Sequence, residues 1–110
     1  MSVTVYAAFI AMYYALDAAY DVNADEELRR YLSGANPFLF KGEGSADPAV
    51  YAEFEQAYKG TCGDCPNAQE ALAAVRGYLK GQDVGVLIAA FDSVVDPGKW
   101  EECLVLGSEM

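Results

Sequence analysis

Hydrophobic residues near the start of the chain recur at steps of three and four, the spacing that places side chains on one face of a helix. The first charged residue comes only at Asp17, and Val5, Met12 and Tyr14 extend the apolar surface beyond one face. The pattern predicts a helix over residues 3–22 that is buried on more than one side, at the centre of the fold. The apolar stripe consists of Tyr6, Phe9, Ile10, Tyr13, Leu16 and Tyr20.

A second helix is predicted directly after this one by a capping pattern. Asn23 can accept a hydrogen bond from the first turn, and Glu26 follows three residues later, as in a capping box. Gly34 is expected to end the helix. Its apolar face is Leu28, Tyr31 and Leu32.

Two further helices are predicted by the same kind of signal. Asp47-Pro48 is a favourable start, because aspartate caps and proline loses only an N–H that would have no partner there. We expect that helix to end at Gly60. Asn67, with Glu70 three residues on, predicts a fourth helix that ends at Gly81.

The last third of the chain predicts two more helices. Valine and isoleucine after Asp83 would also suit a strand, but the apolar positions 84, 87, 88, 91 and 95 follow the helical period. Asp96-Pro97 repeats the start signal for a short helix over about 100–106. The expected fold is all-α, a single compact bundle of five to six helices in one domain over residues 1–110.

The composition indicates a folded chain and reduces the classes of partner that it can bind. Hydrophobic residues make up 54% of the 110 residues and charged residues 22%, too apolar for a disordered acidic segment. The net charge of −10 opposes binding to nucleic acid and to membrane surfaces, which both begin with lysine and arginine meeting phosphate. The apolar run from Val5 to Leu16 is about 12 residues, against roughly 20 for a membrane span. We therefore expect a cytoplasmic protein.

The sequence contains no histidine, the side chain that most often serves as a general base or a neutral metal ligand. Serine-histidine and cysteine-histidine catalytic sites are excluded by this count, and so are zinc hydrolases that hold their metal with imidazole. Any catalytic site in this chain would have to use carboxylate, thiol, tyrosine or lysine side chains.

The sharpest local motif is Cys62-Gly63-Asp64-Cys65, placed directly before a predicted helix. This spacing brings two thiols face to face, and a helix N-terminus lowers a thiol pKa. Asp64 acts in the opposite direction, since its negative charge raises that pKa. With Cys103 the chain offers three thiolate ligands, one short of a closed zinc shell unless a carboxylate completes it. We expect the three cysteines to be structural. The alternative hypothesis is a thiol redox or metal function of the Cys62-Gly63-Asp64-Cys65 motif, with Cys103 as a further metal ligand.

Two carboxylates one turn apart, Asp17 and Asp21, raise the question of acid chemistry, because partial burial would raise the pKa of Asp17. The sequence shows no further residue at a spacing that would form a catalytic site with them. The pattern therefore favours a structural role, either a solvated helix end or a hydrogen bond between Asp17 and a tyrosine. Residues 21–25 match the start of a calcium loop, but Glu26 and Leu32 replace its glycine and closing glutamate. We assign no catalytic residue, no metal and no cofactor.

The function predicted from these features is an acidic interaction or regulatory module that binds a basic protein partner without catalysis. Acidic residues exceed basic ones over 17–27 and 92–109, where a basic partner would dock. Aromatic residues in or beside irregular segments are potential interface anchors. A small-ligand pocket lined by tyrosines and self-association are the other possibilities. The predicted interface residues are Phe38, Phe40, Trp100, Asp21, Asp25, Glu101 and Glu102.

Overall fold

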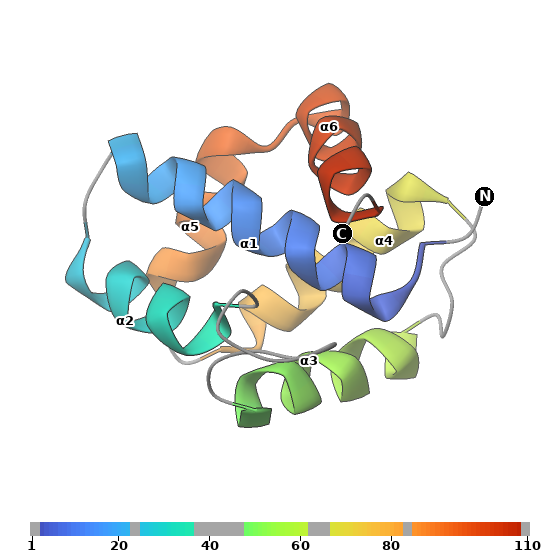
Figure 1. Cartoon of the computed structure of the whole chain (residues 1–110), viewed down its shortest axis with the longest axis horizontal. Coiled ribbons are helices and arrows are strands. Elements are labelled where there is room, and N and C mark those ends of the chain that lie inside the picture. The colour runs from blue at the N-terminus through green and yellow to red at the C-terminus, as the bar shows by residue number, and fades with distance from the viewer. Residues whose placement is uncertain (1–2, 23–24, 37–47, 62–66, 83–84, 109–110) are drawn as a thin grey trace.

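The computed structural model describes residues 3–22, 25–36, 48–61, 67–82 and 85–108, and it shows an all-α bundle (Figure 1). This confirms the predicted fold class. The radius of gyration, 12.5 Å, is close to the roughly 13 Å expected of a domain of this length. Six helices lie in the described part of the chain: α1 (Val5–Val22), α2 (Glu26–Ala35), α3 (Pro48–Thr61), α4 (Ala68–Lys80), α5 (Gly85–Val94) and α6 (Pro97–Ser108).

Helix α1 is the central element, and it contacts each of the other five helices. Its apolar surface extends around the helix, as the sequence predicts, and much of it is fully buried. Alanines recur along its buried surface, and their small side chains let the neighbouring helices approach closely. The helix begins at Val5, two residues later than predicted. Its buried residues are Val5, Ala8, Phe9, Ile10, Ala11, Met12, Ala15, Leu16 and Ala19.

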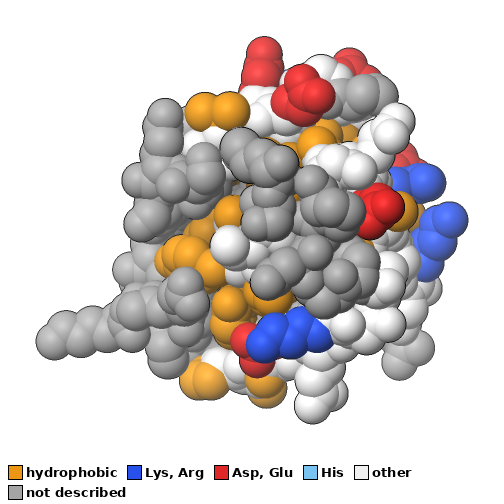
Figure 2. Space-filling view, turned by 90° about the vertical axis from the view of Figure 1, so that its right-hand side faces the viewer, with side chains coloured by type: hydrophobic (Ala, Val, Ile, Leu, Met, Phe, Trp, Pro, Cys, Tyr) orange, Lys and Arg blue, Asp and Glu red, His pale blue; other side chains and the backbone are white. Residues whose placement is uncertain are grey.

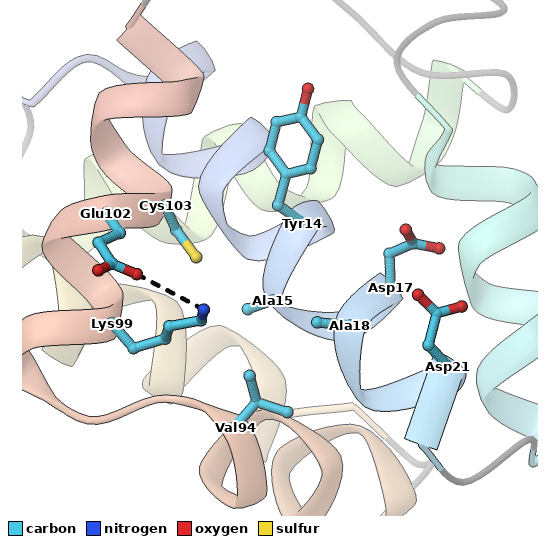
Figure 3. Close-up of a pocket in the computed structure, with 9 residues that line it drawn as sticks. All are labelled: Tyr14, Ala15, Asp17, Ala18, Asp21, Val94, Lys99, Glu102 and Cys103. Carbon is cyan, nitrogen blue, oxygen red and sulfur yellow. Dashed lines mark ion pairs between the residues drawn. The ribbon is translucent and has the colours of Figure 1, made fainter.

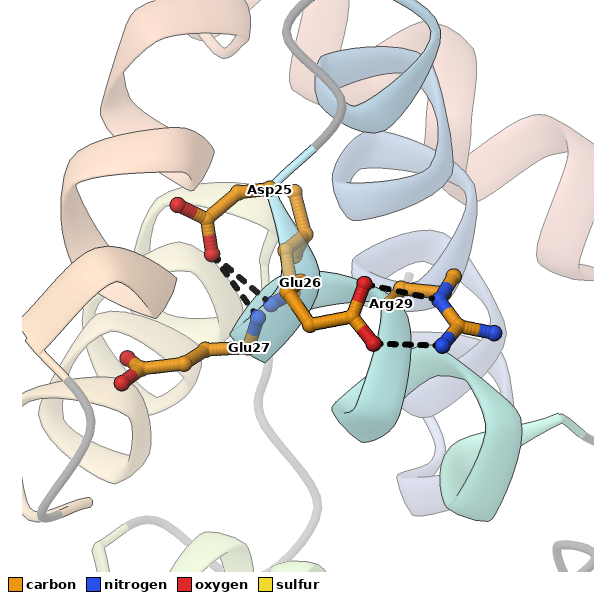
Figure 4. A network of polar contacts seen from close by, with 5 residues as sticks. Asp25, Glu26, Glu27 and Arg29 are labelled. Atoms are coloured by element: carbon orange, nitrogen blue, oxygen red, sulfur yellow. Dashed lines mark hydrogen bonds and ion pairs between the residues drawn. The ribbon is translucent and has the colours of Figure 1, made fainter.

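The cap of α2 differs from the prediction. Asp25 is the capping residue, and its Oδ1 accepts hydrogen bonds from the backbone N–H of Glu27 at 2.9 Å and of Leu28 at 3.3 Å (Figure 4). The prediction of Asn23 as the cap is wrong, because α2 begins only at Glu26 and the cap must directly precede the first turn. Helix α2 also continues through Gly34 and ends at Ala35.

Replacing this cap predicts a measurable loss of stability. Asp25→Ala should lower the free energy of unfolding by about 1 kcal/mol, because two N–H groups of the first turn lose their acceptor. Urea denaturation of the two proteins measures the difference. Asp25→Asn, which keeps an acceptor oxygen, should retain most of the stability. Equal midpoints for Asp25→Ala and the unmodified protein would contradict this account of the cap.

The starts of α4 and α6 follow their capping residues. Asn67 Oδ1 accepts the N–H of Glu70 at 2.9 Å, as predicted, and Gly81 caps the end of α4. Asp96 Oδ1 accepts the N–H of Lys99 at 2.8 Å. Helix α6 therefore begins at Pro97, earlier than the predicted 100–106, and extends to Ser108.

The end of α3 and the start of α5 also lie near their predicted positions. Helix α3 begins at Pro48 and ends one residue beyond Gly60, at Thr61. Its proposed cap, Asp47, lies outside the described residues. Helix α5 begins at Gly85, and the helical period in this segment is confirmed over the competing strand.

Aromatic rings join the helices in two groups. Phe54 of α3 is fully buried, and its ring contacts Phe9 of α1, Tyr58 of α3 and Tyr78 of α4, with centroids 5.1 to 5.7 Å apart. Tyr78 also shares a hydrogen bond of 2.9 Å with the hydroxyl of Tyr31 on α2. The first group thus connects four helices around one set of rings.

The second aromatic group corrects a sequence prediction. Trp100 is only 1% exposed, packed against Phe91 at 5.8 Å between ring centroids, and its indole N–H donates to the Ala68 carbonyl at 2.9 Å. Trp100 is therefore a core residue that joins α4, α5 and α6, and its assignment to a recognition surface is wrong. The reason is that Trp100 lies in the first turn of α6 on the face that packs against α4 and α5.

Candidate functional site

A surface pocket lies between the second half of α1, the end of α5 and the first half of α6 (Figure 3). Its volume is about 240 Å³. Residues from three helices therefore meet here, although they are far apart in the sequence. The pocket is lined by Tyr14, Ala15, Asp17, Ala18, Asp21, Val94, Lys99, Glu102 and Cys103.

Small side chains form the inner wall of this pocket. Ala15 and Ala18 lie one turn apart on α1, Val94 ends α5, and Cys103 projects from α6 toward α1 (Figure 3). Ala15 and Cys103 are buried, while Ala18 and Val94 are half-buried. Because alanine and cysteine are short, they leave a hollow where larger residues would fill the space between α1 and α6.

Two carboxylates form the α1 side of the pocket. Asp17 and Asp21 are exposed and lie one helical turn apart, on the same side of α1 (Figure 3). Partial burial raises the pKa of Asp17, and the charge of Asp21 raises it further. Neither carboxylate makes an ion pair with any described residue. The ionised form of Asp17 is therefore disfavoured by its own surroundings.

The α6 side of the pocket carries one cation and one carboxylate. Lys99 Nζ lies 3.5 Å from Glu102 Oε2, with 48% and 72% of the two side chains exposed. The lysine ammonium points into the pocket, toward α1 (Figure 3). Such an exposed pair contributes little stability. With Asp17 and Asp21, the pocket therefore holds three carboxylates against one ammonium, a net excess of two negative charges.

The thiol of Cys103 completes the inner wall but is poorly suited to nucleophilic chemistry. Burial raises its pKa, more than the nearby ammonium of Lys99 lowers it. A thiol with a raised pKa stays protonated at neutral pH, and the thiolate is the reactive form. Among the described residues, no cluster of three or more carboxylates and thiols could hold a metal ion.

The structure brings together only part of the predicted interface. Asp21 and Glu102 both line the pocket, whereas Asp25 lies at the start of α2 and serves as its cap. Glu101 is exposed on α6 but does not line the pocket. Of the other predicted residues, Trp100 is buried. Phe38, Phe40, Cys62 and Cys65 lie outside the described residues, so the alternative thiol or metal function stays a prediction.

Sequence reasoning missed the apolar wall and the lysine of the pocket. Ala15 and Ala18 are small apolar residues within the first predicted helix and Val94 lies within the fifth, so nothing local marks them as a pocket wall. The one local signal was the pair Asp17 and Asp21, which follows an uninterrupted apolar segment. Lys99 gave no signal of its own, because its relation to α1 depends on how α6 packs.

The face of the molecule in Figure 2 shows how charge is distributed beyond the pocket. Acidic side chains gather toward the upper part of this view, at the height of α6 in Figure 1, and hydrophobic side chains are visible below them. Lysine and arginine side chains appear at the right-hand edge and lower down. Acidic and basic groups are thus unevenly placed on this face.

Comparison with protein-family models, with curated proteins and with solved structures finds no match to this chain. None of the described helices combines the length and the apolar character that crossing a membrane requires.

Proposed function

We propose that this chain is a binding module without catalysis of its own, and that it docks a basic segment of a partner protein at the pocket between α1 and α6. The observation that carries the proposal is the pair Asp17 and Asp21, two carboxylates beside an apolar wall that no described cation neutralises. A cation with an aliphatic stem is complementary to both the charge and the wall.

Two charged residues of the pocket, Asp21 and Lys99, lie at helix ends where the helix dipole disfavours their charge. Asp21 lies in the last turn of α1, at the negative end of the helix dipole, and no basic residue accompanies it in that turn. Lys99 lies in the first turn of α6, at the positive end. Each position costs about 0.3–1 kcal/mol when the charge opposes the dipole. Charges that weaken the fold at one shared site support a binding role for that site.

The net charge of the chain supports the same class of partner. A charge of −10 attracts a basic protein over a distance of about one Debye length, ~10 Å at moderate salt. This long-range attraction raises the rate of encounter, whereas the pocket supplies a defined place to bind. We further propose a cytoplasmic location, with which the free thiol of Cys103 is compatible.

The proposal predicts that the pocket carboxylates matter more than other carboxylates. A fluorescently labelled peptide of alternating arginine, lysine and alanine serves as the probe, and anisotropy measures its affinity at low ionic strength. Asp17→Asn/Asp21→Asn should weaken binding by about tenfold, which corresponds to about 1.4 kcal/mol. The physical reason is the loss of two close charges that face the bound cations.

The matched control is Glu53→Gln/Glu70→Gln, which changes two exposed carboxylates on α3 and α4. Both double variants raise the net charge from −10 by two, to −8. The control should therefore bind within about twofold of the unmodified protein, because only its long-range field changes. Equal losses in both variants would show that the peptide senses the overall charge alone and would refute docking at this pocket.

A further inference from the structure

We infer that the side chain of the partner that enters the pocket is an arginine. The inference rests on the proposed function and specifies the chemistry of the docked group. It follows from three features of the site: the spacing of Asp17 and Asp21, the apolar inner wall, and the ammonium of Lys99 on the opposite side.

The two carboxylates of α1 suit a group that donates several hydrogen bonds at once. Residues four apart on a helix have Cβ atoms about 5–6 Å apart, so Asp17 and Asp21 present their oxygens side by side. A guanidinium has five N–H donors in a planar fork and can bond both carboxylates together. A lysine ammonium is a compact point charge that is more strongly hydrated, and it loses more hydration on entering.

The inner wall favours the same group. Ala18, Val94 and Cys103 give an apolar surface beside the carboxylates, against which the aliphatic stem and the flat face of arginine can pack. The volume of about 240 Å³ is smaller than the roughly 300–1,000 Å³ of pockets that enclose small-molecule ligands. A single side chain is therefore a better fit than a free cofactor.

Lys99 directs the incoming cation toward α1. Its ammonium is 3.5 Å from Glu102 and already meets the carboxylate on the α6 side. A second compact ammonium in the pocket would face this charge directly, whereas arginine spreads its charge over three nitrogens. The guanidinium is consequently placed on Asp17 and Asp21, away from Lys99.

The test uses three peptides of the same, otherwise uncharged sequence that differ only at the central residue, which is arginine, lysine or citrulline. Citrulline keeps the shape of arginine but has no charge. Each peptide is titrated into the full-length protein, and the methyl signal of Ala18, on the inner wall, reports binding at the pocket by NMR. We expect the arginine peptide to bind at least fivefold more tightly than the lysine peptide, and the citrulline peptide at least tenfold more weakly than arginine.

Variants of the protein test whether Asp21 is responsible for the preference for arginine over lysine. Asp21→Asn should lower the arginine-to-lysine ratio by about twofold or more, because the remaining carboxylate can bond only one edge of the guanidinium. Glu53→Gln should leave the ratio unchanged. Equal affinity for arginine and lysine, with citrulline weaker, would overturn the inference and leave the proposed function standing. Three equal affinities, or no shift of Ala18 with any peptide, would overturn both. An arginine preference that is undiminished in Asp21→Asn would place the bound group elsewhere and refute the inference.

Discussion

Trp100→Ala should lower the free energy of unfolding by about 3–5 kcal/mol, the range for removing a large aromatic side chain from a packed core. Trp100 is 1% exposed, contacts Phe91 and donates to the Ala68 carbonyl at 2.9 Å. The alanine variant loses the buried ring and leaves the carbonyl without this donor. Denaturant unfolding followed by far-UV circular dichroism measures the change.

Two controls make this prediction specific. Trp100→Phe keeps an aromatic ring beside Phe91 and loses only the indole donor and some volume, so the loss should be clearly smaller than for alanine. Val105→Ala, at a position of α6 that is 54% exposed, should change stability little. If Trp100→Ala unfolds at the same denaturant concentration as Val105→Ala, Trp100 is not the core contact between α4, α5 and α6 that we describe.

The Trp100 variants also test whether packing of the core supports the pocket. Lys99, Glu102 and Cys103 lie within one turn of Trp100 on α6. Loosening the contact of Trp100 with Ala68 and Phe91 should therefore displace the α6 side of the pocket. We expect weaker peptide binding from folded Trp100→Ala than from folded Trp100→Phe, measured where both variants are fully native.

Phe54→Ala is the second large effect, with an expected loss of about 3–5 kcal/mol. Its ring is fully buried and contacts Phe9, Tyr58 and Tyr78, so its removal opens a cavity where α1, α3 and α4 meet. Aromatic pairs add about 0.5–1.5 kcal/mol beyond the area they bury, which favours the upper part of that range. Thermal or denaturant unfolding gives the value.

Phe54→Leu is the matched control, because it keeps most of the buried volume and loses the ring contacts. It should cost clearly less than alanine, and equal losses would show that the cavity is not the cause. Phe54 does not line the pocket. A folded Phe54 variant should therefore bind the basic peptide with nearly unchanged affinity, in contrast to Trp100→Ala. A parallel loss of binding in both would contradict the separation of core and pocket.

Helix starts can be predicted from local sequence only where one capping residue is available. A cap forms between a side chain and an N–H two or three residues away, so Asn67 and Asp96 are recognisable from the sequence. The α2 cap was misplaced because Asn23 and Asp25 are both capping residues, and Glu26 beside them satisfied the pattern for the wrong one. Choosing between them requires knowing where α1 ends and how α2 packs.

Long-range contacts explain the remaining errors. Trp100 stands beside Asp96-Pro97, which marks a helix start but says nothing about which face of that helix is buried. The Ala68 carbonyl that accepts its indole N–H is 32 residues away in the sequence. Likewise, Asp17 and Lys99 are far apart in the sequence, and no local pattern indicates that α1 and α6 form one pocket.

By itself, the sequence determined the all-α class, the central place of α1, most helix starts and the acidic character of the chain. These properties depend on periodicity, caps and charge counts, which act between near neighbours or over the whole composition. The tertiary structure alone decided that Trp100 is buried and that Asp17, Asp21, Lys99 and Glu102 surround an apolar hollow. Packing of α6 against α4 and α5 buries Trp100, whereas packing of α6 beside α1 forms the hollow. Both depend on which faces of distant helices meet.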